Sequence, residues 1–152
     1  MTTTDEHVEL VAELAGLLET RLLDPLEILL ASGELLEPVR DRLRVEAEVW
    51  AAQLLGPDRE RAAGTAARLI AALFPGDAPF DPPAAWWRTA LGRAVARVTG
   101  HPSAVAVSYS TAGAMLGITR QGVHDLVKRG KLGRHPDGGV TSSSVRDRLN
   151  RP

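Results

Sequence analysis

The side chains with the greatest capacity for chemistry lie between residues 119 and 135. This segment is rich in cations and hydrogen-bond donors: Thr119, Arg120, Gln121, His124, Lys128, Arg129, Lys131, Arg134 and His135. Arginine can donate to O6 and N7 of guanine, glutamine can pair with adenine, and lysine or threonine can bind phosphate oxygens. The segment therefore predicts a surface that contacts double-stranded DNA.

Catalytic and metal-binding chemistry is not predicted. The chain has no cysteine, which excludes disulfides, thiolate metal sites and cysteine nucleophiles. Its histidines, at positions 7, 101, 124 and 135, lack the spacing of metal ligands, so no metal or other cofactor is expected. His124 stands beside Asp125, but no nucleophile accompanies the pair, and we predict that the protein is not an enzyme. His101 precedes a proline and is interpreted as a linker residue.

The spacing of glycine and apolar residues predicts two short helices that hold this polar set. Ser108 is expected to cap the first helix, and Gly117 permits a tight left-handed turn after it. Thr119 is expected to start the second helix, which Gly130 ends. The predicted buried residues of the two helices are Ala112, Met115, Leu116, Val123, Leu126 and Val127. Two short helices joined through a glycine turn predict a helix-turn-helix.

The second helix leaves one polar side free when its apolar side is buried. On a helical wheel Gln121, His124, Asp125 and Lys128 point away from Val123. Asp125 would repel phosphate unless it accepts from a cytosine amino group or pairs with a neighbouring cation. This polar side is therefore the part of the helix that could enter a major groove.

A β-hairpin is expected after the second helix. Its first strand covers residues 131–135, its turn residues 136–139, and its second strand Val140 and Thr141. Ser142 or Ser143 is then expected to cap a last helix that packs back through Val145 and Leu149. The basic first strand is typical of a wing that lies over phosphates or enters a minor groove.

Residues 107–149 resemble the winged helix-turn-helix of the MerR and excisionase superfamily. The resemblance rests on STAGAMLGIT, RQGVHDLVKRGKL and VTSSSVRDRL, in that order, and covers a little under a third of the chain. It implies DNA binding, with Thr119, Arg120, Gln121, His124, Lys128 and Arg134 in the contact surface. The domain comes last, whereas MerR regulators place it first, so the resemblance is nearer to small excisionase-like DNA binders.

Residues 1–100 are predicted to form an acidic helical bundle. Apolar residues recur at three- and four-residue steps from Thr4 to Leu23, and further helices are expected over 25–32, 34–55 and from Asp58 to about residue 73. Asp24 is expected to cap the second of these helices, and Gly33 to end it in the left-handed conformation. The predicted apolar face of the third is Leu36, Val39, Leu43, Ala47, Trp50 and Leu54. That of the fourth is Ala62, Ala66, Leu69, Ile70 and Leu73.

A loop over residues 74–83, which holds four of the ten prolines, precedes one more predicted helix from Ala84 to Val98. Its tryptophan pair, Trp86 and Trp87, is expected to place one ring in the core. The boundary between two domains, 1–100 and 104–152, is predicted at residues 101–103, because the sign of the charge changes there. Residues 1–100 carry a balance of −6, from 10 Arg against 16 Asp and Glu; residues 101–152 carry +5.

The sequence as a whole predicts a mainly α protein with an N-terminal helical bundle and a C-terminal winged helix-turn-helix that has a small β-hairpin wing. We expect a sequence-specific DNA-binding protein, a transcriptional regulator that acts as a homodimer through residues 1–100. Two alternatives remain: an excisionase-like architectural factor, and a DNA-binding antitoxin whose residues 1–100 bind a protein partner. No apolar run reaches the roughly 18 residues that would span a bilayer. The expected location is the cytoplasm, at the nucleoid.

Overall fold

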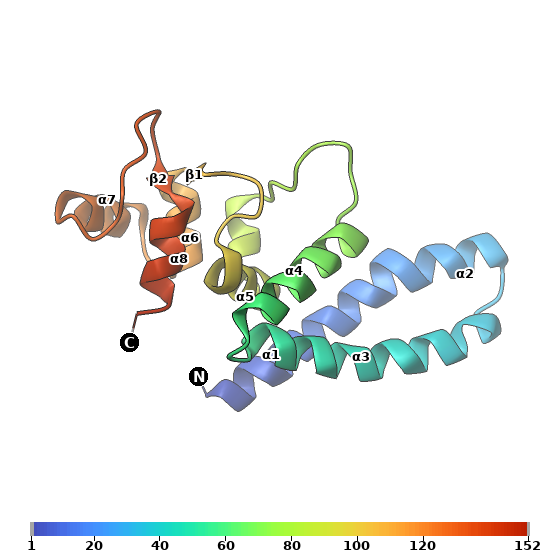
Figure 1. Ribbon diagram of the computed structural model, residues 1–152. Coiled ribbons are helices and arrows are strands. Elements are labelled where there is room, and N and C mark those ends of the chain that lie inside the picture. Colours follow the sequence, from blue (N-terminus) through green and yellow to red (C-terminus); the bar gives the residue numbers. More distant parts are fainter. Residues whose placement is uncertain (1, 152) are drawn as a thin grey trace. The chain divides into compact units, whose positions relative to one another are not determined.

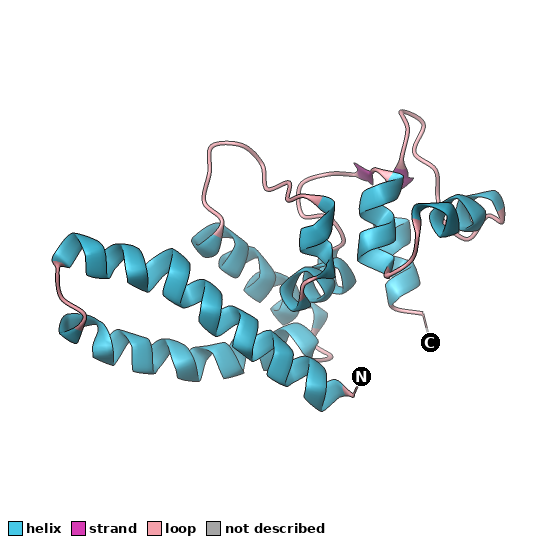
Figure 2. Ribbon diagram, turned by 180° about the vertical axis from the view of Figure 1, so that it is seen from behind, coloured by secondary structure: helices cyan, strands magenta, loops and turns pink. Residues whose placement is uncertain are grey.

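A computed structural model describes residues 2–151, which form two compact units that divide between Pro75 and Gly76. The chain is mainly helical, with one small two-stranded antiparallel sheet in the second unit (Figures 1 and 2). The mainly α class that the sequence predicts is thus confirmed. The first unit consists of α1 (Thr3–Leu18), η1 (Glu19–Leu23), α2 (Asp24–Leu30), η2 (Glu34–Leu36), α3 (Glu37–Leu55) and α4 (Arg59–Leu73).

The long first helix does not break where the sequence predicts. It continues from α1 through η1, a π-helical turn, into α2, and Asp24 is itself helical (φ −58°, ψ −47°) and caps nothing. Pro25 has no N–H to donate to the preceding turn. The helix widens into a π-helical turn directly before this proline, and it therefore continues through Pro25 without ending.

The turn after α2 uses a different residue from the predicted one. Gly33 has an ordinary helical conformation (φ −79°), whereas Ala31 is left-handed, with φ 53° and ψ 32°. A Cβ at Gly33 would lie 2.8 Å from Oε1 of Glu27, but this atom is the end of a flexible side chain that can move aside, so the turn does not depend on glycine there. The left-handed conformation at Ala31 costs free energy that glycine would avoid.

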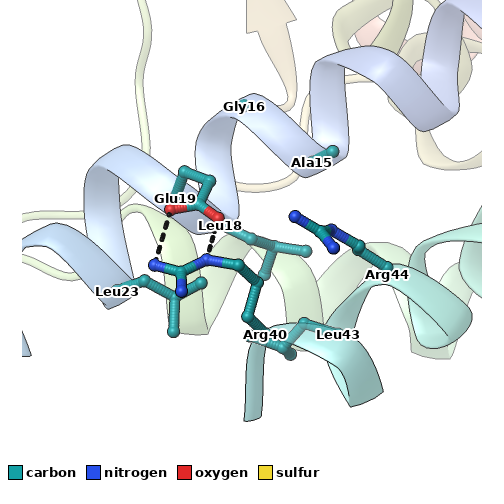
Figure 3. A pocket seen from close by; sticks show the side chains of 8 residues that line it. All are labelled: Ala15, Gly16, Leu18, Glu19, Leu23, Arg40, Leu43 and Arg44. Atoms are coloured by element: carbon teal, nitrogen blue, oxygen red, sulfur yellow. Dashed lines mark hydrogen bonds and ion pairs between the residues drawn. The ribbon is translucent and has the colours of Figure 1, made fainter. Parts of the chain in front are cut away.

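α1 and α3 lie side by side and run in opposite directions, with α2 at the far end of this hairpin (Figure 1). Arg40 of α3 joins the two sides of the hairpin, because its guanidinium donates to Glu19 of η1 at 2.6 Å (Figure 3). Within α3 it also donates to Glu37 at 2.6 Å. The hydrogen bond with Glu19 raises the pKa of the Arg40 guanidinium above its ordinary value, and the charges of Glu19, Glu37 and Glu27 act in the same direction. At the other end of the hairpin, Nε2 of His7 lies 2.7 Å from Oε2 of Glu48.

α4 completes the core of the first unit by packing against α3. It starts where the sequence predicts, at Asp58 or its neighbours, and Asp58 caps it by accepting from the backbone N–H of Arg61 at 3.1 Å. All five residues of its predicted apolar face are buried: Ala62, Ala66, Leu69, Ile70 and Leu73. The face predicted for α3 is only partly confirmed, because Ala47 is buried but Val39 is exposed. Val39 lies close to the start of α3, next to α2, where no third helix covers the hairpin.

The second unit begins with an irregular segment and consists of η3 (Ala84–Arg88), α5 (Ala90–Thr99), β1 (Ala106–Val107), α6 (Tyr109–Leu116), α7 (Arg120–Lys128), β2 (Val140–Thr141) and α8 (Ser142–Leu149). The single helix predicted from Ala84 to Val98 is wrong in one respect. Thr89 is extended (φ −69°, ψ 161°) and separates η3 from α5, where its hydroxyl accepts from the N–H of Gly92 at 3.0 Å. Residues 74–83 are free of helix and strand, as expected for a loop.

The core of the second unit explains why the observed division differs from the one predicted at residues 101–103. Trp87 is fully buried, as are Leu91 and Val95 of α5, and α5 packs on α8 while η3 packs on α6. The side chains of residues 84–99 therefore complete the core of the C-terminal elements. Trp86 is half-buried, with its ring edge-on to Phe80 at 5.1 Å between centroids. The expectation of one core tryptophan in the pair is confirmed.

His101 is not a linker residue, because it is buried in this core. Its Nδ1 accepts from the backbone N–H groups of Ser103 (3.1 Å) and Ala104 (3.0 Å), and its Nε2 lies 3.0 Å from Oδ1 of Asp81. Since Nδ1 is the acceptor, we place the ring proton on Nε2, where it is donated to Asp81. The histidine therefore organises the backbone turn that leads into β1.

The small sheet is formed differently from the predicted hairpin. β2 pairs with β1, a strand that the sequence did not predict, through Ala106 opposite Thr141 and Val107 opposite Val140. Of the predicted first strand, residues 131–135, only Arg134 makes a bridge, to Val140. α8 is capped by Thr141, which accepts from the N–H of Ser144, and not by Ser142 or Ser143. Val145 is fully buried as expected, while Leu149 is half-buried.

Candidate nucleic-acid interface

α6 and α7 are joined by a three-residue turn that depends on two glycines. Ser108 caps α6 by accepting from the N–H of Thr111 at 3.1 Å, as predicted. Gly117 ends α6 in the left-handed conformation (φ 70°, ψ 28°), and the N–H of Ile118 returns to the carbonyl of Gly113 at 2.9 Å. A Cβ at Gly113 would lie 2.8 Å from the carbonyl oxygen of Ile118. The turn therefore packs directly on α6 at a position that only glycine fits.

α7 is anchored at its start and along one side. The hydroxyl of Thr119 accepts from the N–H of Gly122 at 3.0 Å, which confirms the predicted cap. Val123 is fully buried, whereas Leu126 and Val127 are half-buried. The inner side of α7 packs on α6. Its opposite side is thereby left open to solvent.

The structure leaves the sequence-predicted site residues accessible. Eight of the nine are exposed, namely Thr119, Arg120, Gln121, His124, Lys128, Arg129, Lys131 and Arg134, and His135 is half-buried. Residues 76–152 contain 11 basic and 5 acidic residues, so the second unit carries a net charge of +6. Such a surface attracts polyanions.

Four of these residues surround one shallow hollow on the outward side of α7. Gln121, His124 and Lys128 come from α7, and Arg134 comes from the segment that follows it. The hollow is completed by Tyr109, Asp125 and Val127. The other five predicted residues do not line it: Thr119, Arg120, Arg129, Lys131 and His135. The side chains that the sequence predicts to act together thus fall into a central group and a second set outside the hollow.

Two contacts orient the central group. The ring of His124 lies against Tyr109 of α6 with 4.2 Å between centroids and an interplanar angle of 69°. Nε2 of Gln121 donates to Oδ1 of Asp125 at 3.3 Å, one turn further along the helix. Both His124 and Gln121 are therefore held by neighbours before any ligand arrives.

Tyr109 is a residue of this site that the sequence argument missed. Tyr109 directly follows the cap of α6, where helix formation does not restrict which side chain is present. The ring that it contacts, His124, lies 15 positions away in the next helix. The composition could have drawn attention to this residue, because Tyr109 is the only tyrosine of the chain. The helical wheel of α7 could not identify it, because a wheel orders residues within one helix only.

Residues 131–139 form a tight loop after α7. The N–H of His135 donates to the carbonyl of Gly139 at 3.0 Å, and the N–H of Gly138 donates to the carbonyl of His135 at 3.0 Å. Nδ1 of His135 accepts from the N–H of Asp137 at 3.1 Å. Half-buried and bonded in this way, His135 stabilises the loop, while Lys131 and Arg134 remain exposed on it.

Other kinds of site have little support in the described residues. Within residues 2–151, no group of three or more His, Asp and Glu side chains is placed to hold a metal ion. His124 and Asp125 stand on the same exposed face, and the hydrogen-bond partner that the structure gives Asp125 is Gln121. In the same part of the chain no helix is long and apolar enough to cross a bilayer.

Comparison of the chain with protein-family models, with curated proteins and with solved structures finds no match.

Proposed function

We propose that this protein binds double-stranded DNA through α7 and regulates transcription. In this proposal α6, its glycine turn and α7 act as a helix-turn-helix, and residues 131–139 act as a wing, as in the MerR and excisionase proteins that the sequence resembles. The observation that carries the proposal is the exposed side of α7, where Gln121, His124 and Lys128 meet Arg134 around one hollow. The buried Val123 on the opposite side holds this helix in place.

The side chains divide by the DNA groups that they can reach. Arg120 and Gln121 stand in the first turn of α7, the part of a recognition helix that meets base edges in the major groove. Arginine there pairs with guanine and glutamine with adenine. Lys128 at the end of the helix and Arg134 on the loop would bind phosphates, which position the protein without reading sequence.

Asp125 is the informative exception in this cationic surface. Its carboxylate is exposed beside Gln121 and would be repelled by phosphate. A carboxylate in a major groove can instead accept from the N4 amino group of cytosine. We therefore assign Asp125 to a cytosine and expect it to decide one position of the binding site.

Selection from a random double-stranded DNA library tests this proposal. The full chain should enrich one motif, and Gln121→Ala should relax it at one position. Asp125→Asn should change the cytosine preference to adenine, because asparagine pairs with N6 and N7 of adenine. Asp77→Asn, which removes the same charge from an exposed position outside the proposed DNA surface, is the matched control and should leave the motif unchanged. Failure to enrich any motif would contradict sequence-specific binding.

We further propose that two copies bind together. A single small DNA-binding module covers only about 600–1,000 Å² of its own surface, so specificity normally requires two half-sites. The first unit offers exposed apolar side chains on the outer side of α3, Val45 and Val49, which could pair two copies. Light scattering should find a dimer at micromolar concentration. A strict monomer with and without DNA would contradict the pairing and leave DNA binding itself standing.

A further inference from the structure

The end of the α1–α3 hairpin exposes an unusual concentration of apolar side chains. α2 has no buried residue, and Ile28 and Leu29 are 79% and 80% exposed. Four more large apolar residues of this region are also exposed, and with Ile28 and Leu29 they are named the tip patch: Leu26, Ile28, Leu29, Leu30, Leu35 and Val39. Exposed apolar groups gathered in this way mark interaction sites more often than they occur on inert surfaces.

The tip patch lies beyond the part of the hairpin that α4 covers. α4 ends at Leu73, whose carbonyl accepts from the guanidinium of Arg21 at 3.1 Å. α2 starts three residues after Arg21 and extends away from this contact (Figure 1). Among the described residues of the first unit, no helix packs over α2 in the way that α4 packs over α3.

The segment that carries the tip patch, residues 22–39, contains only negative charges. Residues 22–39 contain Asp24, Glu27, Glu34 and Glu37 and no basic residue. Arg40 is the nearest cation in the sequence after them, and its guanidinium is already held by Glu19, Glu37 and Glu27, at 2.6, 2.6 and 3.7 Å. Among the described residues, Asp24 and Glu34 have no ion pair. Asp24 and Glu34, at the edge of the tip patch, therefore carry negative charge that no ion pair among the described residues neutralises.

A hollow beside the patch adds a place for a cation. It is lined by Asp24, Glu27 and Ile28, and by the turn Ala31, Ser32 and Gly33. The carbonyl oxygens at the end of a helix carry partial negative charge, which adds to that of the two carboxylates. An ammonium or guanidinium group would fit this hollow while apolar groups cover Ile28 and Leu29.

We propose that the tip patch docks a polypeptide segment that presents apolar side chains flanked by lysine or arginine. Charge complementarity favours this occupant over a second copy of the same chain. Two tips paired about a twofold axis would bring their acidic rims together, and like charges brought together at an interface oppose binding. A basic partner would instead neutralise Asp24 and Glu34 as it covers the apolar side chains. This inference does not depend on the proposed DNA binding.

Three designed helical peptides of 16 residues serve as probes for titration calorimetry with the full chain. The first places leucines at three- and four-residue steps and lysines at the flanking positions, so that the helix has one apolar face flanked by cations. The second replaces every lysine by glutamate, and the third replaces every leucine by serine. Only the leucine–lysine peptide should bind, and more salt should weaken it. Equal binding of the glutamate peptide, or no binding of any peptide, would overturn the proposal.

Variants then locate the binding surface on the chain. Ile28→Ser with Leu29→Ser should weaken the leucine–lysine peptide about tenfold or more, as loss of central apolar contacts does at other interfaces. Asp24→Asn with Glu34→Gln should weaken it less and flatten its salt dependence. Val105→Ser, and Glu60→Gln with Asp77→Asn, are the matched apolar and charge controls and should bind like the wild type. All these positions are exposed, so circular dichroism should show unchanged folding.

The oligomeric state provides an independent check. If the wild type self-associates and Ile28→Ser with Leu29→Ser alone makes it monomeric, the tip patch is covered by a second copy and the proposed occupant is wrong. If those changes leave the oligomeric state unaltered while they abolish peptide binding, the proposal is supported.

Discussion

The two units differ in the kind of surface that they expose. Among residues 2–151, nine of the ten exposed large apolar side chains belong to the first unit, and Val105 is the one in the second unit. Residues 1–75 carry 14 acidic and 7 basic residues, a net charge of −7, against +6 for residues 76–152. The first surface therefore suits an apolar and basic polypeptide, and the second suits a polyanion. One chain thus presents two surfaces of opposite chemistry.

The interiors of the units differ as well. Small residues bring the helices of the first unit together, since Ala47 and Ala51 of α3 and Ala62 of α4 are completely buried. The second unit is instead built around Trp87, with the ring of His101 beside it at 5.4 Å between centroids. The difference offers ways to perturb one unit and leave the other intact.

The largest effect is expected from Trp87→Ala. Removal of a fully buried tryptophan typically costs about 3–5 kcal/mol of folding stability. Hydrogen exchange should show loss of protection in α6 and α8, which share this core, while α1 and α3 keep theirs. Trp86→Ala, at the half-buried neighbouring position, is the control and should have a smaller effect. Equal loss of protection in α1 and α3 would mean that the two units unfold together and that the division at residue 75 has no thermodynamic meaning.

A smaller effect is expected from Gly113→Ala. The added methyl group would collide with the carbonyl of Ile118, and overpacking of this kind costs about 1–3 kcal/mol. The same change at Gly64, which is exposed inside α4 with open space around it, should stabilise the first unit by about 0.5–1 kcal/mol, because alanine favours helix. Chemical denaturation of both variants measures the contrast. A neutral Gly113→Ala would show that the α6–α7 turn is looser than described.

The smallest effect is expected from Ala31→Gly at the tip of the hairpin. Ala31 is the only non-glycine residue with positive φ among residues 2–151, and glycine should relieve about 0.5–1 kcal/mol of strain there. Ala12→Gly, at an exposed position within α1, should instead destabilise by about 1 kcal/mol. Opposite signs in the two denaturation midpoints are the expected result. A destabilised Ala31→Gly would mean that α2 ends in another conformation.

Much of the local structure could be predicted from the sequence because local interactions determine it. The α4 face follows a strong helical period, and Ser108, Thr119 and Asp58 cap helices through bonds to residues three positions away. The exposed cations of α7, Arg120 and Lys128, could be placed for the same reason, since the helical period fixes which side of α7 faces outward.

The features that the sequence did not predict depend on distant residues. β1 is two residues long and forms only because Val140 and Thr141 come to lie beside it. The boundary at residues 101–103 was inferred from charge, which describes the surface, whereas the division at residue 75 follows from the burial of Trp87, Leu91 and Val95. The contact of Tyr109 with His124 required the angle between two helices, which no single-helix pattern contains.

The central proposal, that α7 and the following loop bind DNA, is tested most directly by fluorescence anisotropy with a random-sequence duplex over a series of KCl concentrations. Lys128→Ala and Arg134→Ala should each weaken binding to all sequences and reduce the salt slope by about one unit. Arg42→Ala, which removes an equally exposed cation from α3 of the first unit, should change neither quantity. Wild-type protein that does not bind even at low salt, or Lys128 and Arg134 variants that bind like the wild type at every salt concentration, would contradict the proposal.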